Sequence, residues 1–250
     1  MHNQDDLYKK AAELIKNAKR VTAFTGAGIS VESGIPPFRG ENGLWSKFNP
    51  EFLDIHYFNT CPEKAWKLIK EIFYDFFGKA IPNAAHIALA NLEKQGLLHA
   101  TITQNIDNLH QIAGSINVYE FHGNSRDLVC TRCHKRVNSS VINMENLPPQ
   151  CPHCRGILKP DFVFFGEPIP DQANSNSFAE TQKSDVFLLI GTTGEIMPAS
   201  LIPHEAAKNH ASIIEINIEP SNYTHSITNI FIKSKATQAM QKIADFLLIP

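Results

Sequence analysis

The sequence predicts an α/β fold: a Rossmann-like, doubly wound parallel sheet with a smaller lobe made of a zinc-ribbon module and a helical insertion. Three features predict it. Short apolar runs alternate with helical patterns along most of the chain. A glycine-rich turn begins the stretch 26-GAGISVESGIPPFRG-40, directly after the first apolar run. Two stretches interrupt the alternation, one aromatic and helical and the other containing four cysteines.

The predicted strands are compact apolar runs rich in β-branched residues, as expected of parallel strands buried on both faces. They cover residues 21–25, 98–103, 117–121, 186–191, 212–217 and 229–233. The predicted helices carry apolar residues at helical spacing. They cover residues 5–19, 62–77, 83–95, 203–209 and 236–247.

With 250 residues, 43% of them hydrophobic, the chain suits one domain spanning residues 1–250. We expect a large lobe from about 1–40, 81–123 and 161–250, and a small lobe from the insertions at about 41–80 and 124–160. The net charge of −2 gives no basic field, so we expect no direct nucleic-acid binding. No segment resembles a signal core or reaches the about 18 apolar residues of a membrane span, so we expect a cytoplasmic protein without membrane contact.

Four of the five cysteines form two Cys-x-x-Cys pairs, Cys130 with Cys133 and Cys151 with Cys154. The 17 residues between the pairs fall within the range of tetrathiolate zinc sites. Four thiolates complete a tetrahedral coordination sphere and leave no position for water. We therefore predict one structural zinc ion per chain. A zinc ribbon that reads nucleic acid is disfavoured, because few basic residues surround the cysteines.

The turn after the first predicted strand indicates a phosphate site. Gly26 and Gly28 permit close backbone approach, and the start of the following helix favours an anion. A tight strand–helix turn without a ligand uses the same residues, so the turn alone does not decide. An ordinary dehydrogenase is disfavoured, because its dinucleotide fingerprint has a third glycine where this chain has Val31. That fingerprint also has an acidic residue at the end of a second strand about 20 residues on, where this chain has the stretch GIPPFRGENGLW instead of a strand.

Polar side chains follow the other predicted strands where each strand ends. They are Gln104, Asn105, Asp107, His122, Thr192 and Asn217. Because the carboxyl ends of parallel strands meet at one edge of a sheet, we expect these side chains to form one site.

As a set, these motifs resemble those of the sirtuins, which are NAD-dependent protein deacylases, and most closely those of bacterial members. The motifs are GAGIS, SGIPPFRG, TQNID, HG, the two cysteine pairs, KPDFVFFGE, GTTGEIMPA and INIE, in the order of the family. The resemblance implies that NAD is a co-substrate, and that acyl-lysine is converted to free lysine with release of nicotinamide and O-acyl-ADP-ribose.

The resemblance also implies which residues contact NAD. The pyrophosphate would lie on the turn of Gly26, Ala27, Gly28, Ile29 and Ser30, close to Gly191, Thr192 and Thr193. Gln104 and Asn105 would hold the nicotinamide ribose, Ile106 and Asp107 the carboxamide, Asn217, Ile218 and Glu219 the adenosine ribose, and Lys235 and Ala236 the adenine. Phe38, Arg39 and Trp45 would cover the site.

By the same resemblance, His122 and Asn105 are the catalytic residues, and His122 is the general base. The acyl-lysine oxygen would displace nicotinamide from the ribose, and His122 would then help a ribose hydroxyl attack the resulting imidate. Imidazole titrates near neutral pH, which suits this role.

The acyl-lysine protein or peptide would lie as an extended strand between two segments. The contacting residues would be Val163, Phe164, Phe165, Gly166 and Glu167 on one side, and Gly194, Glu195 and Ile196 on the other. Phenylalanines in 72–77 and 162–165 would form an apolar tunnel around the acyl-lysine.

Two departures from the family pattern bear on the substrate. Members that remove succinyl or malonyl groups have a tyrosine and an arginine where this chain has Lys70 and Phe73, so a buried acyl carboxylate would lack a cation. We therefore predict acetyl and other uncharged short acyl groups as substrates. The family serine after Gly191 and Thr192 is Thr193 here, which keeps the hydroxyl.

Two alternative functions use the same scaffold. A mono-ADP-ribosyltransferase would let another nucleophile capture the activated ribose, and a non-catalytic reader would only bind acyl-lysine. His122 and the apolar tunnel favour deacylation over ADP-ribosyl transfer, and the complete polar set argues against a reader. We expect His86 and His110 to be ordinary helix or surface histidines.

Overall fold

The computed structural model describes residues 4–38 and 43–249. Six strands form one parallel sheet in the order β3-β2-β1-β7-β8-β9. The strands are β1 (Val21–Thr25), β2 (Ala100–Thr103), β3 (Val118–Glu120), β7 (Val186–Ile190), β8 (Ser212–Asn217) and β9 (Ile230–Lys233). All six match predicted strands. The chain runs from β1 outward to β3 and then starts again at β7 on the other side, so the switch point where such folds bind ligands lies between β1 and β7.

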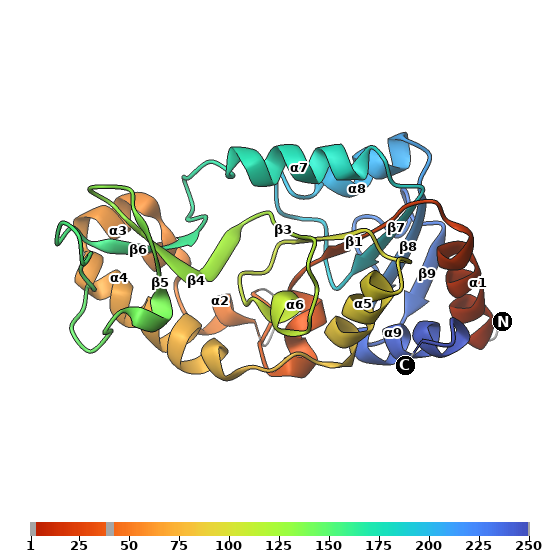
Figure 1. Cartoon of the computed structure of the whole chain (residues 1–250), viewed down its shortest axis with the longest axis horizontal. Helices are drawn as coiled ribbons and strands as arrows, with labels where there is room; N and C mark the ends of the chain where they lie inside the picture. The colour runs from red at the N-terminus through yellow and green to blue at the C-terminus, as the bar shows by residue number, and fades with distance from the viewer. Residues whose placement is uncertain (1–3, 39–42, 250) are drawn as a thin grey trace.

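Helices cover both faces of this sheet (Figure 1). Helices α1 (Gln4–Asn17), α5 (Ala84–Lys94) and α9 (Ala236–Phe246) share one apolar core with one face, and α7 (Asp171–Thr181) and α8 (Leu201–Lys208) lie on the other. Strand β7 shows why: Leu188 and Ile190 enter the first core, whereas Phe187 and Leu189 enter the second. A strand buried on both faces must be apolar throughout, which explains its continuous apolar sequence.

The two insertions form one smaller lobe, at the left of Figure 1. The first contains short helices α2 (Leu44–Lys47) and α3 (Ile55–Thr60), a 3-10 turn (Pro50–Leu53) between them, and helix α4 (Pro62–Ile69). The second forms an antiparallel sheet of β5 (Arg136–Asn138), β4 (Gly123–Cys130) and β6 (Leu158–Phe162). Buried side chains from both insertions make a single core, and the indole N–H of Trp66 in α4 donates to the Leu158 carbonyl in β6 at 2.8 Å.

Three features of the fold differ from the predictions. The predicted helix 62–77 is α-helical only to Ile69 and continues as a π-helical turn (Lys70–Phe76) and a 3-10 turn (Phe77–Lys79). The short helices α2 and α3 lie in the insertion that was predicted to be helical, but their bounds were not predicted, and the short helix α6 (Leu109–Ile112) was not predicted at all. Nor was α7, because it lacks an apolar stripe and instead buries Glu180, which accepts two hydrogen bonds from Arg20, each of 2.7 Å.

Among the residues that the structure describes, no helix has both the length and the apolarity needed to cross a bilayer.

Candidate functional site

The turns after β1 and β7 pack backbone against backbone. The amide of Gly26 donates to the Ile190 carbonyl at 3.0 Å, and the amide of Gly28 donates to the Gly191 carbonyl at 2.9 Å. A Cβ atom on Gly28 would lie 2.5 Å from the Cα of Gly191. Only glycine fits at this crossing, because no backbone atom there can move aside cheaply. The predicted phosphate turn therefore needs glycine because it crosses the turn after β7 at the switch point.

A cavity of about 890 Å³ opens from these turns and extends between the lobes. Its volume lies in the range of small-molecule sites. The predicted residues that line it are Gly26, Ala27, Gly28, Phe38, Trp45, Gln104, Asn105, Ile106, His122, Val163, Phe164, Phe165, Gly166, Glu167, Gly191, Thr192, Thr193, Glu195, Ile196, Asn217, Ile218, Glu219, Lys235 and Ala236. The structure therefore brings predicted residues from all parts of the chain to one cavity.

Four predicted residues are not among those lining the cavity: Ile29, Ser30, Asp107 and Gly194. Arg39 lies outside the described residues. Ser30 and Asp107 stand behind the lining, where the Ser30 hydroxyl donates to Asp107 at 2.7 Å. The Asn105 amide donates both to Ser30 Oγ, at 3.2 Å, and to the Gly26 carbonyl, at 3.1 Å. Asn105 thereby ties the loop after β2 to the glycine turn.

Burial raises the pKa of Asp107, although the hydrogen bonds from the Leu109 amide and the Ser30 hydroxyl oppose the shift. The pKa of Asp107 therefore depends on the position of the loop that carries it.

His122 lies between β3 and β4, at the junction of the large sheet and the small one. Its Nδ1 is 3.1 Å from the Gln104 carbonyl oxygen. A carbonyl can only accept, so Nδ1 carries the proton and Nε2 is left with a free lone pair in the neutral ring. Burial lowers the pKa of His122, which keeps the ring neutral near pH 7. His122 can therefore accept a proton from a group bound in the cavity.

Hydrogen bonds join the loops that follow β2, β7 and β8. Gln104 Nε2 donates to Thr192 Oγ1 at 3.0 Å, and Asn217 Nδ2 donates to the Thr192 carbonyl at 3.0 Å. The polar side of the cavity is thus preorganised, because its side chains are held by one another.

The opposite side of the cavity is apolar. Leu53, Phe73, Phe162 and Phe164 line it, and all four are buried. The Glu167 carboxylate accepts from the Phe164 amide at 2.8 Å and pairs with Lys159 at 2.9 Å, which fixes the turn after Phe164. Leu53 was not predicted, since it stands in a short 3-10 turn with no motif around it.

Two histidines close to the site are more deeply buried than the sequence predicted. His86 in α5 and His110 in α6 lie on helices, as expected, but both are buried rather than on the surface. His110 Nε2 is 2.9 Å from Thr25 Oγ1, and the two rings lie 4.9 Å apart. Burial lowers the pKa of His86 to about 4, and burial together with His86 lowers that of His110 well below its usual value. Isolated histidines in a sequence carry no signal of such a pairing.

The four predicted metal ligands converge in the small lobe. The Sγ atoms of Cys130, Cys133, Cys151 and Cys154 all lie within 4.8 Å of one another. Two of the separations are 3.4 and 3.8 Å, close to the about 3.8 Å between sulfurs bound tetrahedrally to zinc at 2.3 Å. Backbone amides of Arg132 and Cys133 point at the Cys130 sulfur, each at 3.4 Å, as expected around a thiolate. The donor set and geometry fit one Zn²⁺.

The fold and this site together define a dinucleotide-binding α/β protein with a four-cysteine metal module. Residues 26–198 match the Sir2 family, and the chain belongs to that family. The family that the motifs indicated is thereby confirmed, while the closer resemblance to bacterial members stays a prediction.

Curated relatives cover nearly the whole chain. An NAD-dependent protein deacylase of Aeropyrum pernix is 41% identical over 94% of this chain and 95% of its own length. An NAD-dependent protein deacetylase of Caldivirga maquilingensis is 42% identical over 94% of this chain and 91% of its own length.

Solved structures agree with the fold. A mutant Sir2 homologue in complex with ADP-ribose has a TM-score of 0.91 and 36% identity, covering 96% of each chain. A Sir2 protein with a p53 peptide and NAD⁺ has a TM-score of 0.87 and 30% identity, covering 95% of this chain and 97% of its own. Another, with a deacetylated p53 peptide and 3'-O-acetyl-ADP-ribose, has a TM-score of 0.90 and 31% identity, covering 97% and 99%.

Proposed function

We propose that this protein is an NAD-dependent protein-lysine deacylase. It transfers acetyl and other uncharged short acyl groups from lysine to ADP-ribose, and releases nicotinamide. The observation that carries this proposal is the position of His122. Its Nδ1 is engaged by Gln104, and its Nε2 has no partner among the described residues; the ring lines a cavity with the glycine turn on one side and an apolar wall on the other. The names of the curated relatives and the ligands of the solved Sir2 structures support the same reaction.

NAD occupies the polar side of the cavity in this proposal. Its pyrophosphate lies on the glycine turn, its nicotinamide ribose against Gln104 and Asn105, and its adenosine ribose against Asn217 and Glu219. The preorganised hydrogen bonds of these loops support this placement, because they hold polar groups in position before the ligand binds. His122 accepts a proton from a ribose hydroxyl, and Asn105 orients the ribose.

The acyl-lysine peptide lies along residues 163–166. The Phe165 amide and carbonyl already bond to Leu53 and Ile55, at 2.8 and 3.1 Å. Among the described residues, the Val163 carbonyl and the Gly166 backbone have no such partner, so they are available to an added strand. The p53 peptides in related Sir2 structures support a peptide substrate.

The acyl pocket favours uncharged groups. Phe73 is 2% exposed and lines the cavity. Lys70 is not among the lining residues, and its ammonium pairs with Asp75 at 2.7 Å. A succinyl carboxylate would therefore be buried without a cation, at a cost of several kcal/mol.

We also propose that the four cysteines bind one structural zinc ion. Thiolates that remain free to bind a metal require a reducing compartment, which supports a cytoplasmic location.

The test is nicotinamide release from NAD in the presence of acetyl-, propionyl- or succinyl-lysine peptide. We expect release with the first two peptides, and at least about 100-fold lower kcat/KM with the third. Sustained release should be at least about 100-fold slower in His122→Ala, because turnover stalls after nicotinamide has left. ADP-ribose attached to protein in place of free lysine would favour ADP-ribosyl transfer. Equal rates with the succinyl peptide would contradict the proposed pocket.

A further inference from the structure

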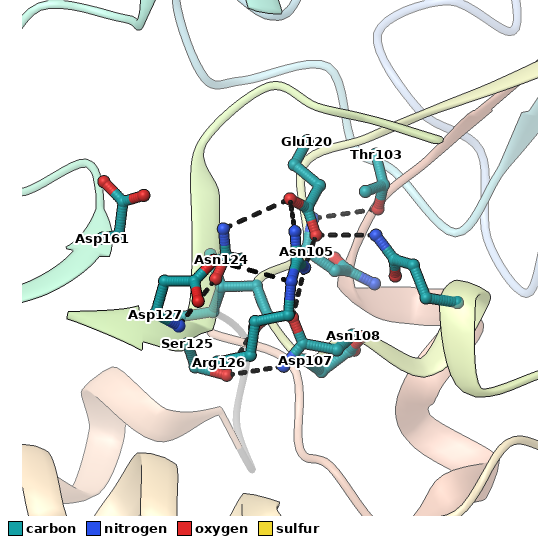
Figure 2. Close-up of polar contacts among 12 residues, drawn as sticks. Thr103, Asn105, Asp107, Asn108, Glu120, Asn124, Ser125, Arg126, Asp127 and Asp161 are labelled. Carbon is teal, nitrogen blue, oxygen red and sulfur yellow. Dashed lines mark hydrogen bonds and ion pairs between the residues drawn. The ribbon is translucent and has the colours of Figure 1, made fainter. Parts of the chain in front are cut away.

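The loop at 104–108 carries the residues that we propose to hold the nicotinamide half of NAD. Four residues outside the cavity form a hydrogen-bonded network at this loop, here called the loop clamp (Figure 2). They are Asn108, which is the last residue of the loop, and Ser125, Arg126 and Glu120. They come from the end of the loop itself, from β3 and from the beginning of β4. None of them was indicated by a motif.

Ser125 fixes the middle of the loop. Its backbone amide and its hydroxyl both donate to the Ile106 carbonyl, at 3.0 and 2.7 Å. The peptide unit is planar, so fixing this carbonyl also fixes the direction of the Asp107 amide. The start of β4 thus sets the backbone at the position where the carboxamide of nicotinamide is expected.

Asn108 turns the chain from the loop into α6 in a conformation that few side chains tolerate. Its φ is 64°, in the left-handed region. Both ends of its amide group are bonded: Nδ2 donates to Ser125 Oγ at 3.0 Å, and Oδ1 accepts from Arg126 Nη1 at 3.0 Å. The turn is therefore stabilised by the side chain as well as by the ability of asparagine to adopt it.

The orientation of the Arg126 guanidinium is fixed by a second contact, with Glu120. It forms a two-pronged ion pair with Glu120, with Nη2 at 2.7 Å from Oε2 and Nη1 on Oε1. Glu120 also accepts from Gln111 at 2.7 Å and from Asn124 at 3.3 Å, so the carboxylate is itself held in place. A planar fork fixed in this way can direct its third bond to Asn108, which a lysine could not do.

We infer that Arg126 is a positioning residue for the nicotinamide half of NAD: by bonding to both Asn108 and Glu120, it holds residues 106–108 of the loop in the shape that receives the carboxamide. This inference rests on the proposed function, which places nicotinamide against that loop. A simpler reading is that Arg126 only joins the two lobes. The two readings differ in which ligand they affect.

ADP-ribose distinguishes them, because it has every part of NAD except nicotinamide. A general loosening of the lobes would weaken NAD and ADP-ribose alike, whereas a displacement confined to residues 106–108, on the carboxamide side of the loop, weakens NAD more than ADP-ribose. The chain also offers a matched control. Arg136 forms an ion pair with Asp161 at 2.6 Å in the same small sheet, and no contact of Arg136 with the 104–108 loop occurs among the described residues.

The experiment measures the Kd of NAD and of ADP-ribose by calorimetry for the wild type, Arg126→Met, Arg126→Lys and Arg136→Met. We expect Arg126→Met to raise the Kd of NAD about fivefold, the size of effect that the loss of one ordinary hydrogen bond has. The Kd of ADP-ribose and the KM of the acyl peptide should stay within about twofold of wild type. Arg126→Lys should resemble Arg126→Met, and Arg136→Met should resemble wild type.

Asn108→Gly provides a second variant that keeps the left-handed turn but removes its side-chain bonds. We expect it to weaken NAD selectively as well. Parallel loss of NAD and ADP-ribose affinity, or no loss of either, would overturn the inference, as would an equal effect of Arg136→Met. The ratio of the Kd values for NAD and ADP-ribose is measured without turnover. A wild type that binds NAD without releasing nicotinamide would therefore contradict the proposed function, while the Kd ratios would still decide this inference.

Discussion

The protonation state of His122 sets the pH range in which it can act as a base. Burial lowers its pKa below the usual 6.5, and the hydrogen bond to Gln104 opposes burial only in part. A base must be neutral, so activity is present above the pKa of His122 and is lost as the pH falls through it. We expect the acidic limb of the kcat/KM profile to have its midpoint below pH 6.5, measured with acetyl peptide from about pH 5 to 8.

The residual activity of His122→Ala should show no such limb, which makes the variant the control for this profile. A midpoint at or above the ordinary value for histidine would show that His122 is not held neutral as the geometry requires.

At the scale of the elements, the turns after β1 and β7 are in backbone contact, and glycine is needed where the two turns cross. In Gly28→Ala the new methyl group would lie 2.5 Å from Gly191 Cα and 2.9 Å from Gly191 O. One turn must move, which we expect to cost about 1–3 kcal/mol of stability and to weaken ADP-ribose binding by at least about tenfold.

Gly78→Ala is the matched control, because nothing lies within 4 Å of a Cβ atom at Gly78. Thermal unfolding measures the stability of the two variants, and calorimetry measures their affinity for ADP-ribose. The pair compares the same added methyl group at a crowded and at an open position. Wild-type affinity in Gly28→Ala would show that the turn is not the phosphate site.

The elements that could be predicted from the sequence are those with a local signal. All six strands of the large sheet were predicted. The central strands are buried along nearly their whole length, which favours apolar and β-branched residues, whereas the edge strands β3 and β9 are only partly buried and were predicted from their β-branched and aromatic residues. The small sheet was foreseen only as a cysteine module, since β5 has an exposed, polar sequence. Helix α7 gave no periodic signal because it buries Ser177, Glu180 and Thr181.

The same distinction applies to the site. The strand-end residues that line the cavity could be predicted because topology brings those ends together, whereas Asp107 lies behind the lining. The roles of Arg126 and His110 depend on partners in other elements, Asn108 and Thr25, and on side-chain geometry. No spacing along the chain encodes such contacts, so only the folded structure reveals them.

The molecule as a whole depends on the metal module, because the cavity lies between the lobes and the small lobe supplies its apolar wall. Cys130 and Cys151 belong to the same buried core as Phe73 and Phe162, which line the cavity. Trp66, fully buried in that core, reports on its integrity. Four-thiolate zinc sites contribute folding free energy directly, so loss of the metal should open the small lobe before the large one.

We therefore expect about one zinc ion per chain, and expect Cys151→Ser to lose zinc, shift tryptophan emission to longer wavelength and abolish nicotinamide release. Cys61→Ser is the matched control, since Cys61 lies outside the four-cysteine cluster, and it should keep both zinc and activity. Hydrogen exchange should then show protection lost in β4 and β6 while β1 and β7 remain protected, because the large sheet has its own two apolar cores. Full activity in a zinc-free Cys151→Ser protein would mean that the small lobe holds the apolar wall without its metal.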